Sequence, residues 1–173
     1  MGSCDSCLVR NTAICAALGK EEIEALNNIG RRRYLAAGET LVWEGEQSVL
    51  VANVIEGMLK LSTGTADGRE QIVGVVYPSD FVGPFAAQTE HAITALTDAR
   101  VCVFGRADFE RFASEHPALE HKLLQRTLVE LDRTRKWMLL LSRKNAEEKV
   151  ATFLIDMAQR LGGAACDAPA QGG

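Results

Sequence analysis

The stretch Val51-Ala-Asn-Val-Ile-Glu-Gly-Met-Leu-Lys-Leu-Ser62 decides the fold class of this chain. It holds two short apolar runs, Val51–Ile55 and Met58–Ser62, with Gly57 between them. Runs of four to eight residues rich in valine and isoleucine are typical of β-strands, and glycine permits the tight turns that connect antiparallel strands. The sequence therefore predicts a β-structure at the middle of the chain.

The same pattern of short apolar runs separated by glycines extends over residues 31–105. Many short strands at near-regular spacing predict an antiparallel barrel or jelly roll rather than a parallel sheet with crossover helices. The other predicted strands are Thr40–Trp43, Gln71–Tyr77, Ile93–Leu96 and Val101–Phe104, and the other glycines between the runs are Gly38, Gly45, Gly64, Gly68 and Gly83.

Helical patterns flank this β region. Lys20–Ile29 places Ile23 and Leu26 on one face and has acids in its first turn, where the helix dipole favours them. Residues 106–115 form a second short helix, and Pro117 suits the first position of a long one. Since residues 118–161 contain neither proline nor glycine, we expect helices over 118–142 and 146–161. The apolar face of the last helix comprises Val150, Phe153, Leu154, Met157 and Leu161.

The long helix carries a heptad pattern, which is the spacing of a coiled-coil seam. At 1.5 Å per residue it would be roughly 38 Å long, more than a small domain covers alone. One charged residue, Arg135, interrupts the otherwise apolar seam. The seam consists of Leu124, Leu128, Leu131, Arg135 and Met138.

Composition limits the function classes. With 173 residues, 47% of them hydrophobic and 24% charged, the chain fits one ordinary domain with an appendage. A net charge of −4 argues against a stand-alone nucleic-acid binder, which would normally be basic. No apolar run approaches the length of a membrane span, and the amino terminus lacks the pattern of a secretory leader. We therefore expect a cytoplasmic protein without a membrane partner.

The cysteines are the most informative residues. Cys4, Cys7 and Cys15 lie in the first fifteen positions, and Cys102 lies in mid-chain. In a cytosolic chain such a cluster indicates metal or redox chemistry more often than a disulfide framework. The spacing Cys4-x-x-Cys7 lets one loop present two thiolates to neighbouring iron atoms, and strand alternation turns Cys102 away from the face of its neighbours.

From these residues alone several alternatives remain open. A structural zinc ion or a redox-active dithiol would also suit a single CxxC pair. Cys102 by itself is more often a small buried hydrophobe. Cys166 lies in a tail of glycine and alanine, and we expect no ligand role for it.

Three longer stretches resemble Fnr-type members of the Crp/Fnr family of transcription regulators, particularly the FnrN-like branch. The similarity covers nearly the whole chain, from Cys4 to about Leu161. The first stretch is Cys4-Asp-Ser-Cys7-Leu-Val-Arg-Asn-Thr-Ala-Ile-Cys15-Ala-Ala-Leu18. The second is Phe81-Val-Gly83-Pro-Phe85 followed by Thr94-Ala-Leu-Thr-Asp-Ala-Arg-Val-Cys102-Val-Phe104, and the third is Met138-Leu-Leu-Leu-Ser-Arg-Lys-Asn-Ala-Glu-Glu-Lys149.

The resemblance implies an oxygen-responsive transcription regulator in which Cys4, Cys7, Cys15 and Cys102 bind a [4Fe–4S] cluster. It implies a β-roll like that of cyclic-nucleotide-binding proteins, a homodimer formed through the long helix, and no enzyme activity. The implied division is a cluster-binding loop (1–18), a β-roll sensor (19–116), a dimerisation helix (117–143), the leading helix of a DNA-binding domain (144–161) and a flexible tail (162–173).

The resemblance also bears on DNA. In this family a winged helix-turn-helix follows the dimerisation helix, and its recognition helix reads the major groove. The sequence reaches Gly173 without such an element. We therefore expect DNA and RNA polymerase as partners only of a chain that carries that domain.

Two other function classes receive less support. A cyclic-nucleotide site needs an acid after the glycine of the Phe81 stretch and an arginine cradle for the phosphate, but Gly83 is followed by Pro84-Phe85, and Arg69 and Arg100 lie outside any such cradle. An iron oxygenase would need two histidines and a carboxylate around one metal. The histidines, none of them in an H-x-H pair, are His91, His116 and His121.

Overall fold

A computed structural model describes residue 4 and residues 7–47, 49–65, 67–83 and 88–166, apart from the side chains of 162–166. The chain divides into two compact units, Met1–Lys122 and Leu123–Gly173. Residues 1–3 and 5–6 of the predicted loop, Pro84 and Phe85, the side chain of Cys166 and residues 167–173 of the predicted tail lie outside this description.

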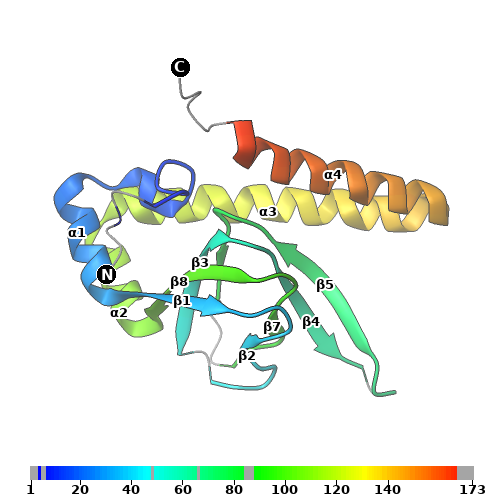
Figure 1. Cartoon of the computed structure of the whole chain (residues 1–173), viewed down its shortest axis with the longest axis horizontal. Helices are drawn as coiled ribbons and strands as arrows, with labels where there is room; N and C mark the ends of the chain where they lie inside the picture. The colour runs from blue at the N-terminus through cyan, green and yellow to red at the C-terminus, as the bar shows by residue number, and fades with distance from the viewer. Residues whose placement is uncertain (1–3, 5–6, 48, 66, 84–87, 167–173) are drawn as a thin grey trace. The chain divides into compact units, whose positions relative to one another are not determined.

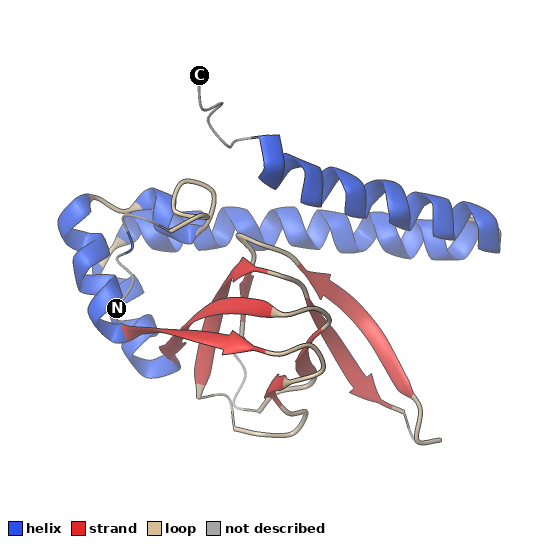
Figure 2. Ribbon diagram, in the orientation of Figure 1, coloured by secondary structure: helices blue, strands red, loops and turns tan. Residues whose placement is uncertain are grey.

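The first unit is an antiparallel β-roll, as the sequence predicts. In the described part of the chain, two four-stranded sheets have the strand orders β1-β8-β3-β6 and β2-β7-β4-β5 (Figures 1 and 2). The strands are β1 (Gly30–Leu35), β2 (Thr40–Val42), β3 (Leu50–Glu56), β4 (Leu59–Gly64), β5 (Glu70–Val76), β6 (Phe81–Val82), β7 (Ala92–Ala95) and β8 (Ala99–Gly105).

The hydrophobic core of the roll is formed by alternate residues of both sheets. Val54 on β3 and Val101 on β8 are fully buried, and Leu59 on β4 meets them in the same cluster. Full burial of one such side chain stabilises the fold by about 1.5–3 kcal/mol. Because side chains alternate along a strand, the residues between these point to the other face of β3 and β8.

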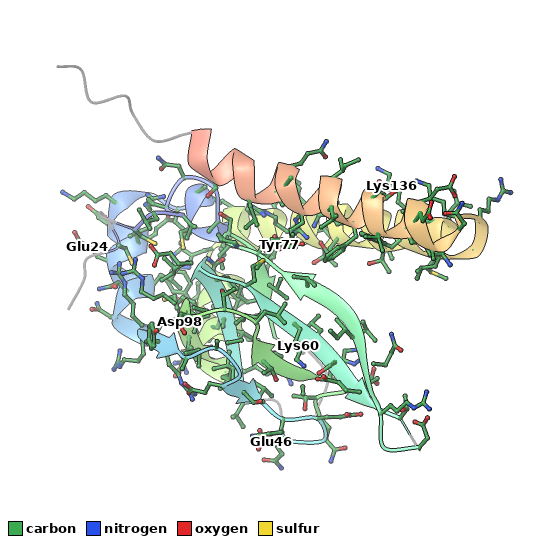
Figure 3. The ribbon with its side chains drawn as sticks, turned by 45° about the vertical axis from the view of Figure 1, so that its right-hand side comes forward. Glu24, Glu46, Lys60, Tyr77, Asp98 and Lys136 are labelled. Carbon is green, nitrogen blue, oxygen red and sulfur yellow. The ribbon has the colours of Figure 1, made fainter. Side chains whose placement is uncertain are left out.

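The turn at Gly57 joins the two sheets. Gly57 has φ +78°, and a Cβ atom there would lie 2.3 Å from the carbonyl oxygen of Asp98, so only glycine fits. Asp98, labelled in Figure 3, also accepts a hydrogen bond from the Ala37 N–H at 3.0 Å. The strands on either side of Gly57, β3 and β4, pair with other strands and not with each other. The glycine pattern therefore predicts strands but not their partners.

Two short helices lie side by side at one end of the sheet that contains β1 and β8 (Figure 1). They are α1 (Lys20–Ile29) and α2 (Arg106–Glu115), both with the predicted bounds. The Gly19 N–H donates to the Glu22 carboxylate at 2.6 Å, which satisfies one free donor at the start of α1. Buried Leu26 and Phe109 fix the two helices to the core.

Two strands and one helix end were not predicted. Strand β1 has the sequence GRRRYL and is largely exposed at the edge of its sheet, where charged side chains are common. Strand β6 has only two residues.

The last helix, α4 (Ala146–Cys166), runs five residues past the predicted end at Leu161. Two glycines cost a helix only about 1 kcal/mol each, and Ala164 and Ala165 favour its continuation.

The second unit contains the carboxyl-terminal part of α3 (Pro117–Arg143) and the helix α4. Asn145 and Glu148 form a reciprocal cap at the start of α4: each side chain accepts a hydrogen bond from the other's backbone N–H, at 2.9 and 3.0 Å. The rings of Trp137 and Phe153 lie 6.1 Å apart between the two helices. Lys136, labelled in Figure 3, pairs with Asp132 at 2.8 Å on the surface of α3.

The predicted seam on α3 is uncovered in the single chain. Leu124, Leu128 and Met138 are 56%, 55% and 66% exposed. Large apolar side chains in such a row normally pack against a partner. Across the described residues, α3 and α4 included, every helix is too short or too polar to traverse a bilayer.

Candidate cysteine site

The leading segment is a chain of short turns that presents three cysteines. The Cys7 N–H donates to the Cys4 carbonyl at 3.2 Å, and the Arg10 N–H donates to the Cys7 carbonyl at 3.0 Å. Cys15 lies in a 3₁₀ turn, η2 (Ile14–Ala17). Such local bonds fix the backbone of a segment that has no strand partner.

This segment is packed into the protein. Ala13 and Ile14 are fully buried, and Val9 is 6% exposed. Val9 and Ala13 form a small hydrophobic cluster with Ile55 of β3, against which Cys7 and Cys102 pack. The leading segment therefore contributes to the hydrophobic core, because its apolar residues cover the outer face of β3.

Arg10 holds the turn that carries Cys15. Its guanidinium donates to the carbonyl oxygens of Cys15 at 2.8 Å and Leu18 at 3.2 Å. Thr12 shares a hydrogen bond of 2.6 Å with Ser79, which ties the segment to the turn before β6. The segment is thus positioned by contacts with the protein itself.

The fourth cysteine comes from the middle of a sheet. Strand β8 lies between β1 and β3, and the residues directly opposite Cys102 are Arg32 and Asn53. Val101 and Val103 belong to the core of the roll, so alternation directs Cys102 to the outer face. This orientation agrees with the sequence prediction. Gly30 leaves space there, since a Cβ atom at that position would lie 3.2 Å from the Cys102 sulfur.

Cys4, Cys7, Cys15 and Cys102 all line one cavity. The cavity encloses about 430 Å³, including the open space at its mouth. The Cys4 thiol also lies 3.2 Å from the side-chain oxygen of Asn27 on α1. The remaining lining residues are Val9, Arg10, Leu26, Arg32, Asn53, Ile55 and Phe104.

Burial keeps the deepest thiols protonated. It raises the pKa of Cys15 to about 11 and that of Cys102 to about 12. The neighbouring cysteines raise both values further, because a second negative charge nearby is unfavourable. The positive charge of Arg10 lowers the pKa of Cys15, and that of Arg32 lowers the pKa of Cys102, in both cases by less than burial raises it. All four cysteines are free of disulfide bonds.

The cysteines surround the cavity without meeting at one point. Among the described side chains, no three of histidine, cysteine, aspartate or glutamate are grouped so that they would hold a single metal ion. This holds also for His91, His116 and His121. His116 instead bonds to the Phe112 carbonyl through Nδ1 at 2.6 Å. The geometry thus offers four separate sulfur donors around one space.

Sequence reasoning missed the polar residues around the cysteines. Arg10, Arg32, Asn27 and Asn53 line the cavity with them. A signal was present only for Asn53, which is the single polar residue in the apolar run Val51–Ile55. The arginines could not be identified, because β1 was not recognised as a strand and the turns of the leading segment have no period.

Comparison with known proteins gives consistent results. A family described as the cyclic nucleotide-binding domain matches residues 32–116. The chain is 42% identical over 158 residues to the transcriptional activator protein FnrL of Cereibacter sphaeroides, covering 91% of this chain and 64% of that protein. It is 36% identical over 159 residues to the nitrogen fixation regulation protein FixK of Bradyrhizobium diazoefficiens, covering 91% and 67%.

A solved structure supports the same assignment. The structure of FixK2 from Bradyrhizobium japonicum superposes with a TM-score of 0.69 at 31% identity, covering 76% of this chain and 67% of that one. The chain spans about two thirds of the length of these relatives (64% for FnrL). The names of the two relatives describe a transcriptional activator and a regulation protein, and not enzymes.

Proposed function

This chain belongs to the Crp/Fnr family of transcription regulators, and on that basis we propose that it is the sensory and dimerisation part of an oxygen-responsive regulator. Cys4, Cys7, Cys15 and Cys102 would hold a [4Fe–4S] cluster. The observation that carries the proposal is that these four thiols, from two distant segments, line one cavity. A similarity to the fumarate nitrate reduction regulatory protein of Klebsiella oxytoca, 29% identical over 161 residues, is in keeping with it.

The chemistry of the donors fits such a cluster. Iron–sulfur clusters are held by cysteine thiolates, one on each iron of a four-iron cluster, so the four sulfurs stand around the cluster. When bound, the cluster supplies a centre that reacts with oxygen. The positive charges of Arg10 and Arg32 stabilise the negatively charged thiolates of Cys15 and Cys102, respectively. Cys102 would join the leading segment to the central strand β8.

The zinc alternative fits this arrangement less well. A structural zinc ion needs four ligands at about 2.0–2.3 Å from a single point. In the described residues no three ligand-type side chains are grouped in that way. Cysteines that surround a cavity favour a polynuclear centre over one ion.

Anaerobic reconstitution with iron and sulfide distinguishes these two sites. We expect a brown protein with broad visible absorption that bleaches on exposure to air. Absorption spectra before and after admission of air are the measurement. A colourless protein that takes up one zinc ion per chain would contradict the cluster proposal.

We further propose that the chain forms a homodimer through the seam Leu124, Leu128, Leu131, Arg135 and Met138. The leucines and methionine of this row are 43–66% exposed in the single chain. A charge in such a seam costs stability unless it is paired. The pKa of Asp132 is lowered first by Lys136, with which it pairs at 2.8 Å, and only to a smaller extent by Arg135. Arg135 would therefore keep the dimer marginal, so that the state of the cysteine site decides its population.

Replacing Arg135 with leucine is expected to give a dimer in air and under anaerobic conditions alike, because the substitution completes the apolar seam. The state of the cysteine site would shift the free energy of dimerisation by about 1–3 kcal/mol. The apolar contact added by leucine at position 135 would exceed that shift. Sedimentation analysis of the metal-free protein measures the monomer fraction. Arg133→Leu is the matched control, since Arg133 pairs with Glu130 at 2.6 Å outside the seam. An unchanged monomer fraction in R135L rejects the idea.

A cyclic nucleotide is the second candidate ligand, because the matching family carries that name. Two arginines that lie outside any phosphate cradle are already paired with acids: Arg100 with Glu56 at 2.5 Å and Arg69 with Asp67 at 3.3 Å. We expect cyclic AMP and cyclic GMP to leave the melting temperature unchanged. A rise that saturates with nucleotide concentration would support this ligand instead.

DNA and RNA polymerase would be contacted by a full-length regulator through a winged helix-turn-helix of the kind that this family carries. The relatives are longer than the stretch that they share with this chain. We assign the regulator to the cytoplasm, where its DNA targets would be. In such a regulator, the cysteine site on the β-roll would respond to oxygen, and α3 would pass that response on through a change in dimerisation.

A further inference from the structure

A buried asparagine next to the cysteines has an unused hydrogen-bonding group. Asn53 is 2% exposed and lines the cavity with the four cysteines. Among the described residues its side-chain oxygen, Oδ1, finds no donor. Buried polar atoms without a partner are rare in folded proteins, and each calls for an explanation.

The sheet places this amide beside a ligand sulfur. Asn53 on β3 lies directly opposite Cys102 on β8. Directly opposed residues of antiparallel strands have Cβ atoms about 4.5–5.5 Å apart and point to the same face. On that face the neighbours of Asn53 along its own strand, Val51 and Ile55, are apolar and buried. An apolar residue would therefore satisfy the fold at position 53.

The Val54 carbonyl keeps a hydrogen-bond partner if the Asn53 amide turns. Its Nδ2 group now donates to the Val54 carbonyl at 3.2 Å. That carbonyl already accepts a shorter bond, 2.9 Å, from the Ser79 N–H. Rotation about the last side-chain bond exchanges the directions of oxygen and nitrogen, so that an N–H points where Oδ1 now lies. The oxygen then faces the Val54 carbonyl, and the hydrogen bond to the charged sulfur must outweigh that unfavourable contact.

We propose that Asn53 is a positioning residue of the cysteine site, whose side-chain N–H donates a hydrogen bond to a ligand sulfur when the cluster is bound. This inference rests on the proposed function. Hydrogen bonds to the sulfurs are among the factors that set the reduction potential of iron–sulfur clusters. A donor at Asn53 stabilises the more electron-rich state and thereby slows loss of the cluster in air.

The variant Asn53→Leu tests this role, because leucine has a similar size and no hydrogen-bonding group. We expect the reconstituted variant to bleach in air about fivefold faster than the wild type, the factor that corresponds to one hydrogen bond of ordinary strength. Its reduction potential should fall, and its Fe–S stretching bands in resonance Raman spectra should shift. The metal-free variant should be at least as stable to urea as the wild type, since an orphaned polar atom has been removed. A purely structural asparagine gives the opposite pattern, with lower stability and unchanged bleaching.

The exposed Asn28→Leu is the matched control and should bleach at the wild-type rate. If N53L does not fold, Asn53→Asp serves in its place: its carboxylate keeps the shape but only accepts hydrogen bonds, so it should load less iron than the wild type. Wild-type bleaching in N53L, or wild-type loading in N53D, would overturn the inference. The outcome for the proposed function is separate, because it fails only if the unaltered protein binds no iron and sulfide.

Discussion

Replacing Cys102 with serine is expected to abolish cluster binding while leaving the β-roll folded. Serine has nearly the same shape as cysteine, but its hydroxyl does not supply a thiolate. Cys102 stands at the centre of its sheet, and the other three cysteines come from the leading segment. Without it, one iron lacks its protein ligand and the leading segment loses its link to β8. Iron should fall from about four per chain to near zero.

The free energy of unfolding of the metal-free C102S variant should differ little from that of the metal-free wild type. The thiol packs at the edge of a small cluster with Val9, Ala13 and Ile55. Exchange of one buried sulfur for oxygen there should cost about 1 kcal/mol. Urea denaturation measures this cost, and iron analysis after anaerobic reconstitution measures the loading. Cys166→Ser is the control and should load fully. Full loading of C102S, or loss of iron in C166S, would contradict the assignment of ligands.

Truncating Ile14 to alanine is expected to destabilise the protein by about 2–5 kcal/mol, the usual cost of removing a large buried aliphatic side chain. Ile14 is fully buried in η2, directly before Cys15. The variant therefore tests whether the leading segment is packed on the β-roll even when no metal is bound. The measurement is the free energy of unfolding in urea, made on metal-free protein.

Leu8→Ala provides the matched comparison, because Leu8 lies in the same segment and is 69% exposed. It should change the free energy of unfolding by no more than about 0.5 kcal/mol. Equal stability of I14A and the wild type would mean that the segment does not pack as described. The same packing makes deletion of residues 1–15 a poor test of metal binding, since that deletion would also remove part of the core.

The three cysteines of the leading segment could be recognised as a group because their signals are local, whereas Cys102 was joined to them by the family resemblance. Three cysteines within fifteen residues stand out in any sequence, and period-two alternation gave the direction of Cys102. Helices α1 and α2 were predicted with their bounds, since apolar spacing and flanking glycine mark both ends of α1. Such features depend on neighbours in the sequence and so can be recognised without a structure.

Features that depend on distant contacts were missed. The charged sequence of β1 has no strand pattern, and its pairing with β8 is what forms the strand. Burial of Val9 and Ala13 depends on their contact with Ile55 of β3, and the short spacing of the cysteines gave no indication of it. The position of Asn53 opposite Cys102 follows from sheet register, which neither segment encodes alone.

Binding of one iron–sulfur cluster by the four thiols is tested most directly by the content of iron and acid-labile sulfide in protein purified without exposure to air. We expect about four iron atoms and four sulfide ions per chain, and the joint loss of both on exposure to air. One zinc ion per chain with no sulfide, or neither metal nor sulfide after anaerobic reconstitution, would contradict cluster binding.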